Sequence, residues 1–343
     1  MKAAFIRELG GLERIEFGEL PDPVPGPGEV RVKVRAAALN RLDVFVRNGI
    51  PGIALAFPHV MGADGAGVID STGPEVASLR HGDEVVLNPG IDCGDCEFCR
   101  AGEHSLCVSF RILGEHLPGT FAQYVVVPAA NARPKPPGLS WEEAAAFPLT
   151  FLTAWRMLVT KARVRPGETL LIIGIGGGVG TAALQIARLL GMTVFVTSGS
   201  PEKLARAKAL GAEGGIDHAR TDFSREIRKL TGKRGVDVVL DSVGKATWKQ
   251  SIASAARGGR LLTCGATTGP DPQTDLARIF WNQLTVYGST MGTRGEFEAM
   301  SKIFAEGRVR PVIDGVYPLS RAREAMEIME GGRQFGKVVL RVD

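Results

Sequence analysis

The chain contains 343 residues, which is too long for one small core and suits two domains of ordinary size. Hydrophobic residues make up 44% of the sequence and charged residues 23%, so disordered and collagen-like classes are excluded. The net charge is +4 and bases are mixed with acids along the chain, which indicates a solvated surface and no nucleic-acid partner.

From Met1 to about Asn131, short segments of alternating polarity are separated by turn residues. Val30–Val34 alternates apolar and basic residues, as a half-buried strand does, and a loop rich in proline and glycine precedes it. Further strands are expected at Val85–Leu87 and Tyr124–Val127. Many short strands divided by glycine and proline predict a small barrel or sandwich.

Four of the five cysteines lie close together in this part of the chain, at Cys93, Cys96, Cys99 and Cys107. An odd number of cysteines in a chain without a secretion signal favours metal binding over the alternative, paired disulfides. Four thiolates at this spacing can close a tetrahedral shell around one zinc ion and leave no open position for substrate. We therefore predict one structural zinc in a lobe at residues 92–107, with His104 left at the surface.

From about Pro166 the sequence alternates strands with helices, which predicts a doubly wound parallel sheet. A helix at Thr181–Leu190 is expected to end at Gly191, and another follows Ser200 and ends at Gly211. The last fifty or so residues add a helix near 321–329 and a strand at 337–342. The expected strands of the sheet are Thr169–Ile173, Thr193–Val196, Val236–Leu240, Arg260–Cys264 and Leu284–Tyr287.

A glycine-rich loop joins the first of these strands to the first helix. Its glycines let the backbone approach a pyrophosphate, and the helix N-terminus supplies free N–H groups. The spacing departs from G-x-G-x-x-G because Ile175 stands where the first glycine would; a tight turn is the alternative interpretation. The strand before the loop and the helix after it favour dinucleotide binding. The candidate cofactor-binding residues are Gly174, Gly176, Gly177, Gly178, Val179 and Gly180, with Cys264 and Gly265 at the end of a later strand, although Cys264 also suits a buried small residue.

The second strand of this sheet ends without an acidic residue. A carboxylate at this position holds the adenosine ribose of NAD, and it would repel the 2′-phosphate of NADP. Ser198, Ser200 and Lys203 could instead bind that phosphate, so we expect NADP(H) to be preferred over NAD(H). The alternative is that these hydroxyls only cap the next helix.

The apolar segments of the chain are short. The longest, such as Leu170–Ile173, fall far below the roughly 20 residues that cross a bilayer. The first eight residues reach charged side chains before an apolar signal segment can form. We therefore expect a cytoplasmic protein with no membrane partner.

The order of these parts resembles the medium-chain dehydrogenase/reductase superfamily: small barrel, four-cysteine lobe, glycine loop and a return to the first domain. The resemblance runs nearly end to end and includes Gly62–Val68, Gly119–Tyr124 and Gly235–Asp241. It implies a GroES-like domain of residues 1–130 and 291–343, a Rossmann domain of residues 131–290, and substrate binding between them. It also implies a homodimer or homotetramer.

Alcohol dehydrogenases of this superfamily hold a second, catalytic zinc with a Cys, a His and a further Cys or Asp. Asn40, Ala63 and Leu149 stand at or near the matching positions here. Methyl and isobutyl groups cannot ligate a metal, and one Asn is a poor zinc ligand, so we expect no catalytic zinc. Asn40 and Asp43 are similar instead to the zinc-free quinone oxidoreductase branch, which prefers NADPH but generally lacks the cysteine lobe.

These features predict hydride transfer between NAD(P)H and a small carbonyl, enone or quinone. Without zinc, the oxyanion that develops on the substrate needs hydrogen-bond donors or water. Asn40 is the candidate for orienting substrate, nicotinamide amide or water, and Asp43 and Asp64 are further catalytic candidates that equally suit loop anchors. Two alternatives remain open: a zinc-type alcohol dehydrogenase with unusual ligands, and a non-catalytic NADPH-binding protein.

Overall fold

The computed structural model describes all residues, 1–343, and the chain divides into two compact units. The first unit comprises Met1–Leu152 and Gly292–Asp343, and the second comprises Thr153–Met291. The expected boundary at residue 130 is therefore too early. The reason is that helix α3 (Trp141–Ala146) packs on strands of the first unit rather than on the parallel sheet. The expected boundary after residue 290 lies one residue from the observed one.

The first unit is built around a seven-stranded sheet in the order β10-β6-β5-β3-β18-β17, with β9 also paired to β3. Its strands are β3 (Glu29–Ala38), β5 (Asp64–Thr72), β6 (Glu84–Leu87), β9 (Tyr124–Pro128), β10 (Ala132–Pro134), β17 (Ile313–Pro318) and β18 (Lys337–Arg341). The strands predicted at 30–34, 85–87 and 124–127 lie within β3, β6 and β9 and are confirmed. Along most of β3, alternate residues such as Val30, Val32 and Val34 are buried, which explains the period of two.

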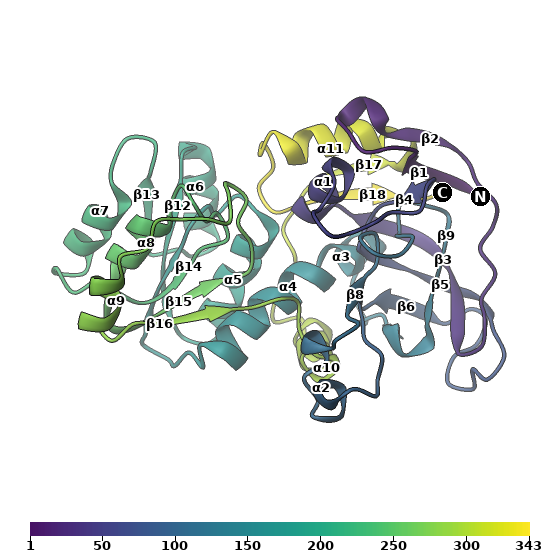
Figure 1. Ribbon diagram of the computed structural model, residues 1–343, viewed down its shortest axis with the longest axis horizontal. Helices are drawn as coiled ribbons and strands as arrows, with labels where there is room; N and C mark the ends of the chain where they lie inside the picture. The colour runs from purple at the N-terminus through teal and green to yellow at the C-terminus, as the bar shows by residue number, and fades with distance from the viewer. The chain divides into compact units, whose positions relative to one another are not determined.

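Smaller elements complete this unit (Figure 1). Two further sheets contain β1 (Lys2–Ile6), β2 (Glu16–Glu19) and β4 (His59–Val60), and β7 (Gly90–Ile91) with β8 (Arg111–Ile112). The helices are α1 (Arg41–Asn48), α2 (Glu97–Arg100), α3, α10 (Arg294–Ala305) and α11 (Ala322–Glu330), with α4 (Pro148–Trp155) at the boundary. Single turns of helix lie at Leu12–Arg14, His104–Leu106, Ala129–Asn131 and Leu319–Arg321.

The pairing of β3 with β18 positions the site described below. Val339 lies opposite Ala38 and Leu340 opposite Ala37 in an antiparallel register. The backbone N–H of Leu39 donates to the carbonyl of Val338 at 2.9 Å. The end of β3 is therefore held beside the beginning of the C-terminal strand, which brings together residues about 300 positions apart in the sequence.

The second unit contains a six-stranded sheet in the order β13-β12-β11-β14-β15-β16, in which every pair of neighbours is parallel. This is the predicted doubly wound arrangement, with helices packed along the strands (Figure 1). The strands are β11 (Thr169–Ile172), β12 (Thr193–Ser198), β13 (Gly214–Asp217), β14 (Val236–Leu240), β15 (Ala255–Thr263) and β16 (Thr285–Gly288). The helices are α5 (Gly178–Leu189), α6 (Pro201–Ala209), α7 (Phe223–Leu230), α8 (Trp248–Ser254) and α9 (Leu276–Trp281), with a π-helical turn at Arg156–Lys161.

The start of helix α5 differs from the expected one. Helix α5 begins three residues before the expected Thr181, because Gly177 is its N-cap.

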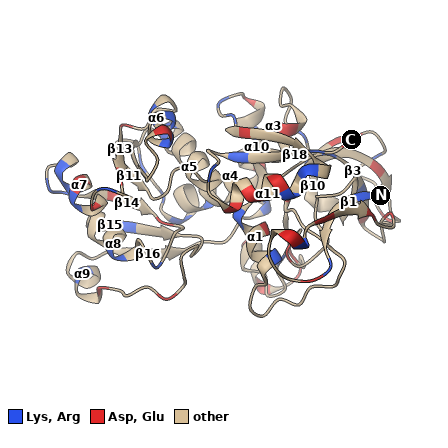
Figure 2. Cartoon of the chain, turned by 90° about the horizontal axis from the view of Figure 1, so that it is seen from above, with Lys and Arg blue, Asp and Glu red and all other residues tan.

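Lys and Arg side chains are interspersed with Asp and Glu over both units (Figure 2). None of the helices combines the length and the apolar character that crossing a membrane requires.

Candidate functional site

The four cysteines of the lobe come together as predicted. Their sulfur atoms all lie within 4.8 Å of one another, with Cys93 to Cys99 at 3.9 Å and Cys96 to Cys99 at 3.5 Å. Zinc–sulfur bonds of about 2.3 Å place the sulfurs of a tetrahedral site about 3.8 Å apart. All four cysteines are free thiols. The residues present therefore fit a structural zinc.

Hydrogen bonds and burial shift the pKa values of these thiols in opposite directions. Backbone N–H groups of Asp95 and Cys96 donate to the Cys93 sulfur and lower the pKa of that thiol to about 6. Burial raises the pKa of the Cys99 thiol to about 12. A buried thiolate is stable only beside a cation, and a zinc ion bound by the four sulfurs would supply that charge.

An ion pair fastens the lobe to helix α10. The two carboxylate oxygens of Asp92, whose side chain is 1% exposed, accept from Arg294 Nη2 at 2.8 Å and Nε at 3.0 Å. Such a bidentate pair fixes orientation as well as distance. Because Asp92 directly precedes Cys93, the metal lobe and the beginning of α10 are held as one structure within the first unit.

The glycine loop has the geometry that a diphosphate requires. Gly174 adopts a left-handed backbone with φ of +75°, and its N–H donates to Thr197 Oγ1 at 3.1 Å. A Cβ added at Gly177 would meet nothing within 4 Å, so space is open before the helix. The N–H groups of Gly178, Val179 and Gly180 lie in the first turn of α5, where they have no intrahelical acceptor. These residues fit the pyrophosphate of a dinucleotide.

The other candidate cofactor residues lie at the ends of neighbouring strands. Ser198 Oγ accepts from the N–H of Ser200 at 3.1 Å, and Ser200 Oγ accepts from the N–H of Lys203 at 3.3 Å. Ser200 is thus the N-cap of α6, as the alternative interpretation expected, and its hydroxyl proton remains available to donate. Cys264 follows β15, and burial raises the pKa of its thiol to about 12, which makes it unreactive.

The catalytic candidates Asn40, Asp43 and Asp64 meet in the first unit. Asn40 precedes α1, and Asp43 lies in its first turn. The Asp43 carboxylate accepts from the N–H of Asn40 at 2.7 Å and from that of Gly62 at 3.2 Å, so it holds the start of α1 against the segment before β5. Burial raises the pKa of Asp43 to about 7. Asp43 therefore holds two backbone segments together, which is the structural role that the sequence analysis gave as its alternative.

Asp64 and Asn40 share a third partner that the sequence analysis did not identify, Lys337. Lys337 Nζ donates to Asn40 Oδ1 at 2.6 Å and to Asp64 Oδ2 at 2.8 Å. Asn40 Nδ2 donates to the same Asp64 oxygen at 2.9 Å. Asn40 is 4% exposed, Asp64 0% and Lys337 2%. The only indication in the sequence is that a lysine begins an otherwise apolar strand. Its hydrogen-bond partners could not be identified from the sequence, because they lie 297 and 273 residues away.

The positions that match a catalytic zinc site offer no ligand set. Ala63 is fully buried, and the backbone N–H of Leu149 donates to Asp64 Oδ1 at 2.8 Å. The histidine nearest to Ala63 in the sequence is His59. Its Nε2 lies 3.0 Å from the carbonyl oxygen of Gly114, and burial lowers the pKa of its imidazole. No thiolate or imidazole stands at the three matching positions, so the residues present do not fit a catalytic zinc.

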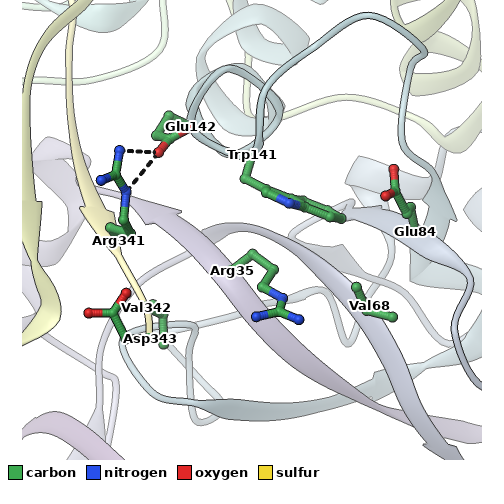
Figure 3. A pocket seen from close by; sticks show the side chains of 8 residues that line it. All are labelled: Arg35, Val68, Glu84, Trp141, Glu142, Arg341, Val342 and Asp343. Atoms are coloured by element: carbon green, nitrogen blue, oxygen red, sulfur yellow. Dashed lines mark hydrogen bonds and ion pairs between the residues drawn. The ribbon is translucent and has the colours of Figure 1, made fainter.

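A pocket elsewhere in the first unit contains none of the predicted site residues (Figure 3). There, Arg341 on β18 is paired with Glu142 of α3 at 2.7 Å. The pocket is lined by Arg35, Val68, Glu84, Trp141, Glu142, Arg341, Val342 and Asp343.

Comparison with known proteins assigns the family. The alcohol dehydrogenase GroES-like domain family matches residues 26–137, and the zinc-binding dehydrogenase family matches residues 178–306. The acryloyl-coenzyme A reductase of Metallosphaera sedula is 32% identical over 99% of both chains. Human quinone oxidoreductase is 27% identical, with 99% of this chain and 97% of the relative covered. A crystal structure described as an NAD-dependent alcohol dehydrogenase is 49% identical, covers 100% of both chains and superposes with a TM-score of 0.96.

The chain belongs to the medium-chain dehydrogenase/reductase superfamily, as the sequence analysis predicted. It is an NAD(P)-dependent oxidoreductase with a GroES-like unit and a Rossmann unit.

Proposed function

We propose that this oxidoreductase reduces an activated C=C or C=O bond of a small quinone, enone or aldehyde, without a catalytic zinc. The observation that carries the proposal is the cluster of Asn40, Asp64 and Lys337. Alcohol dehydrogenases of the superfamily have metal ligands in this region. Here the same region contains the hydrogen-bonded side chains of the cluster. When NADPH is bound, its nicotinamide ring supplies the hydride.

The chemistry of the two reaction directions differs in its need for a metal. Alcohol oxidation must remove a hydroxyl proton, and a bound zinc assists by lowering the pKa of its oxygen ligand. Reduction of a quinone or enone spreads the developing charge over a conjugated system, so hydrogen-bond donors suffice to stabilise it. The names of two relatives, quinone oxidoreductase and acryloyl-coenzyme A reductase, support this direction. The name of the 49% identical structure supports the alternative, alcohol oxidation.

A substrate panel tests the proposal. NADPH oxidation is measured with cyclohexenone, a benzoquinone and an aldehyde, beside NAD⁺ and NADP⁺ reduction with primary and secondary alcohols. Zinc polarisation contributes several kcal/mol of transition-state stabilisation, so its lack should leave kcat/KM for cyclohexenone and the benzoquinone at least ~100-fold above that for alcohols. A higher kcat/KM for alcohols than for these acceptors would contradict the proposal. Tight NADPH binding with no turnover of any compound would favour a non-catalytic NADPH-binding protein.

We propose further that NADP(H) is the preferred cofactor, because no carboxylate stands at the end of β12. Replacing Ser198 with Asp should weaken NADPH binding by ~10-fold or more and favour NADH, since a carboxylate repels the 2′-phosphate. The dissociation constants of both cofactors are measured by fluorescence titration. Ser198→Asn, which has the same size without the charge, is the matched control. An unchanged ratio of the two constants in S198D would remove the argument.

A further inference from the structure

The buried lysine of the first unit has a fixed set of partners. Lys337 begins β18, and the register of that strand with β3 places its side chain against the residues that follow β3. Its ammonium group contacts Asn40 Oδ1 at 2.6 Å and Asp64 Oδ2 at 2.8 Å. The Asp64 carboxylate balances the charge, and its other oxygen accepts from the N–H of Leu149. An ammonium group only donates hydrogen bonds, so Lys337 can face only acceptor atoms.

This constraint decides the orientation of the Asn40 amide. The oxygen of a carboxamide accepts and its nitrogen donates, and the surrounding donors and acceptors determine which is which. Lys337 holds the amide oxygen, and Asp64 Oδ2 accepts one of the two Nδ2 protons at 2.9 Å. The second Nδ2 proton has a long contact of 3.4 Å with the carbonyl oxygen of Ala38. A stronger acceptor than this distant carbonyl can take that proton.

The ammonium group also makes the amide a better donor. Hydrogen bonds to an ionised group are roughly twice as strong as those between neutral groups, and each bond in a chain polarises the next. Electron density drawn towards Lys337 leaves the Nδ2 protons more positive. At 4% exposure, Asn40 experiences this effect with little screening by water.

We propose that Lys337 is a positioning residue for the reduction: it orients and polarises Asn40, whose second Nδ2 proton donates to the oxygen of the substrate that gains negative charge. This inference rests on the proposed function, because it assigns the donor that a zinc-free reduction needs. Asp64 has the role of counter-ion to Lys337 and of acceptor for the other Nδ2 proton. Asp43, which accepts from backbone N–H groups, holds the segment that carries Asn40.

A double-mutant cycle tests whether Lys337 acts through Asn40. Lys337→Met alone would leave the Asp64 carboxylate buried without a counter-charge, so it is combined with Asp64→Asn in one neutral variant. The cycle compares the wild type, Asn40→Ala, the neutral variant and the triple variant. The measurements are kcat and KM for cyclohexenone with NADPH, the dissociation constant of NADPH, and the melting temperature.

Asn40→Ala should lower kcat by ~100-fold, the usual effect of removing one oxyanion donor. The neutral variant should lower kcat by at least ~10-fold, because in it the Asn40 amide loses both its orientation and its polarisation. In the triple variant, the loss should equal that of Asn40→Ala within ~2-fold, since without the Asn40 amide the removal of Lys337 has no donor left to affect. The dissociation constant of NADPH should remain unchanged, because the proposed acceptor of the second Nδ2 proton belongs to the substrate and not to the cofactor.

Additive losses in the triple variant, or a neutral variant with wild-type kcat, would overturn the inference. If the neutral variant does not fold, Lys337→Gln combined with Asp64→Asn replaces it in the same cycle, because glutamine keeps a donor but lacks the charge; a full kcat there would equally overturn the inference. Lys337→Arg, which keeps a charged donor, should retain more activity than Lys337→Gln. A wild-type chain that reduces no quinone or enone would instead contradict the proposed function, so the two failures are distinguishable.

Discussion

Replacing Gly177 with aspartate is expected to abolish cofactor binding while the fold stays intact. Gly177 has φ of −83°, and a Cβ there would meet nothing within 4 Å, so the side chain fits without strain. As the N-cap of α5, an aspartate would even stabilise the helix by a few tenths of a kcal/mol. Its carboxylate would, however, lie where the pyrophosphate approaches the helix N-terminus. Two like charges about 4 Å apart near a protein surface repel by about 4 kcal/mol.

The dissociation constant of NADPH should therefore rise at least ~100-fold in G177D. Binding is measured by fluorescence titration, and the melting temperature without cofactor should stay within ~2 °C of the wild type. Gly295→Asp is the matched control, because a Cβ at Gly295 meets only Thr293 Oγ1 at 4.0 Å and the residue lies in the first turn of α10, in the first unit. NADPH binding of wild-type strength in G177D would show that the loop does not cradle the diphosphate.

Replacing Cys107 with serine is expected to release the structural zinc and to destabilise the first unit. A serine hydroxyl is a far weaker zinc ligand than a thiolate, and zinc binding is coupled to folding of its site. The damage should extend beyond the lobe, because Asp92, next to the ligand Cys93, is paired with Arg294 on α10. We expect a loss of about 3 kcal/mol or more, which for a domain of this size lowers the melting temperature by about 6–12 °C.

Calorimetry and metal analysis of the same preparation measure both effects. Cys264→Ala is the control, because it removes a thiol outside the lobe and should leave the zinc content unchanged. Treating the wild type with a strong chelator should reproduce the loss in melting temperature. Full zinc occupancy or a wild-type melting temperature in C107S would contradict the assignment of this cysteine as a ligand.

Local patterns in the sequence predicted the parts of the molecule that depend on neighbouring residues. The cysteine spacing indicated a tetrahedral site because its ligands lie within fifteen residues of one another. The glycine loop was recognised despite its irregular spacing because a buried strand precedes it and an apolar helix follows it. The cap at Ser200 followed from the proline after it.

Features set by long-range pairing could not be predicted in this way. The residue Lys337 belongs to the cluster because β18 pairs with β3, and nothing near it in the sequence indicates that pairing. Helix α3 has a capping box at Ser140 and Glu143, which indicates where the helix begins but not which sheet it covers. The first domain boundary was placed too early for that reason. The number of hydrogen bonds to Asn40 and Asp43 likewise depends on residues from separate segments.

Metal analysis of the purified wild-type chain distinguishes a protein with one structural zinc from one that also binds a catalytic zinc. Zinc is measured per chain by mass spectrometry after extensive dialysis without chelator. We expect one zinc per chain, which is lost in C107S and unaffected by Asn40→Ala. Two zinc ions per chain, one of them lost in Asn40→Ala, would contradict a zinc-free catalytic site.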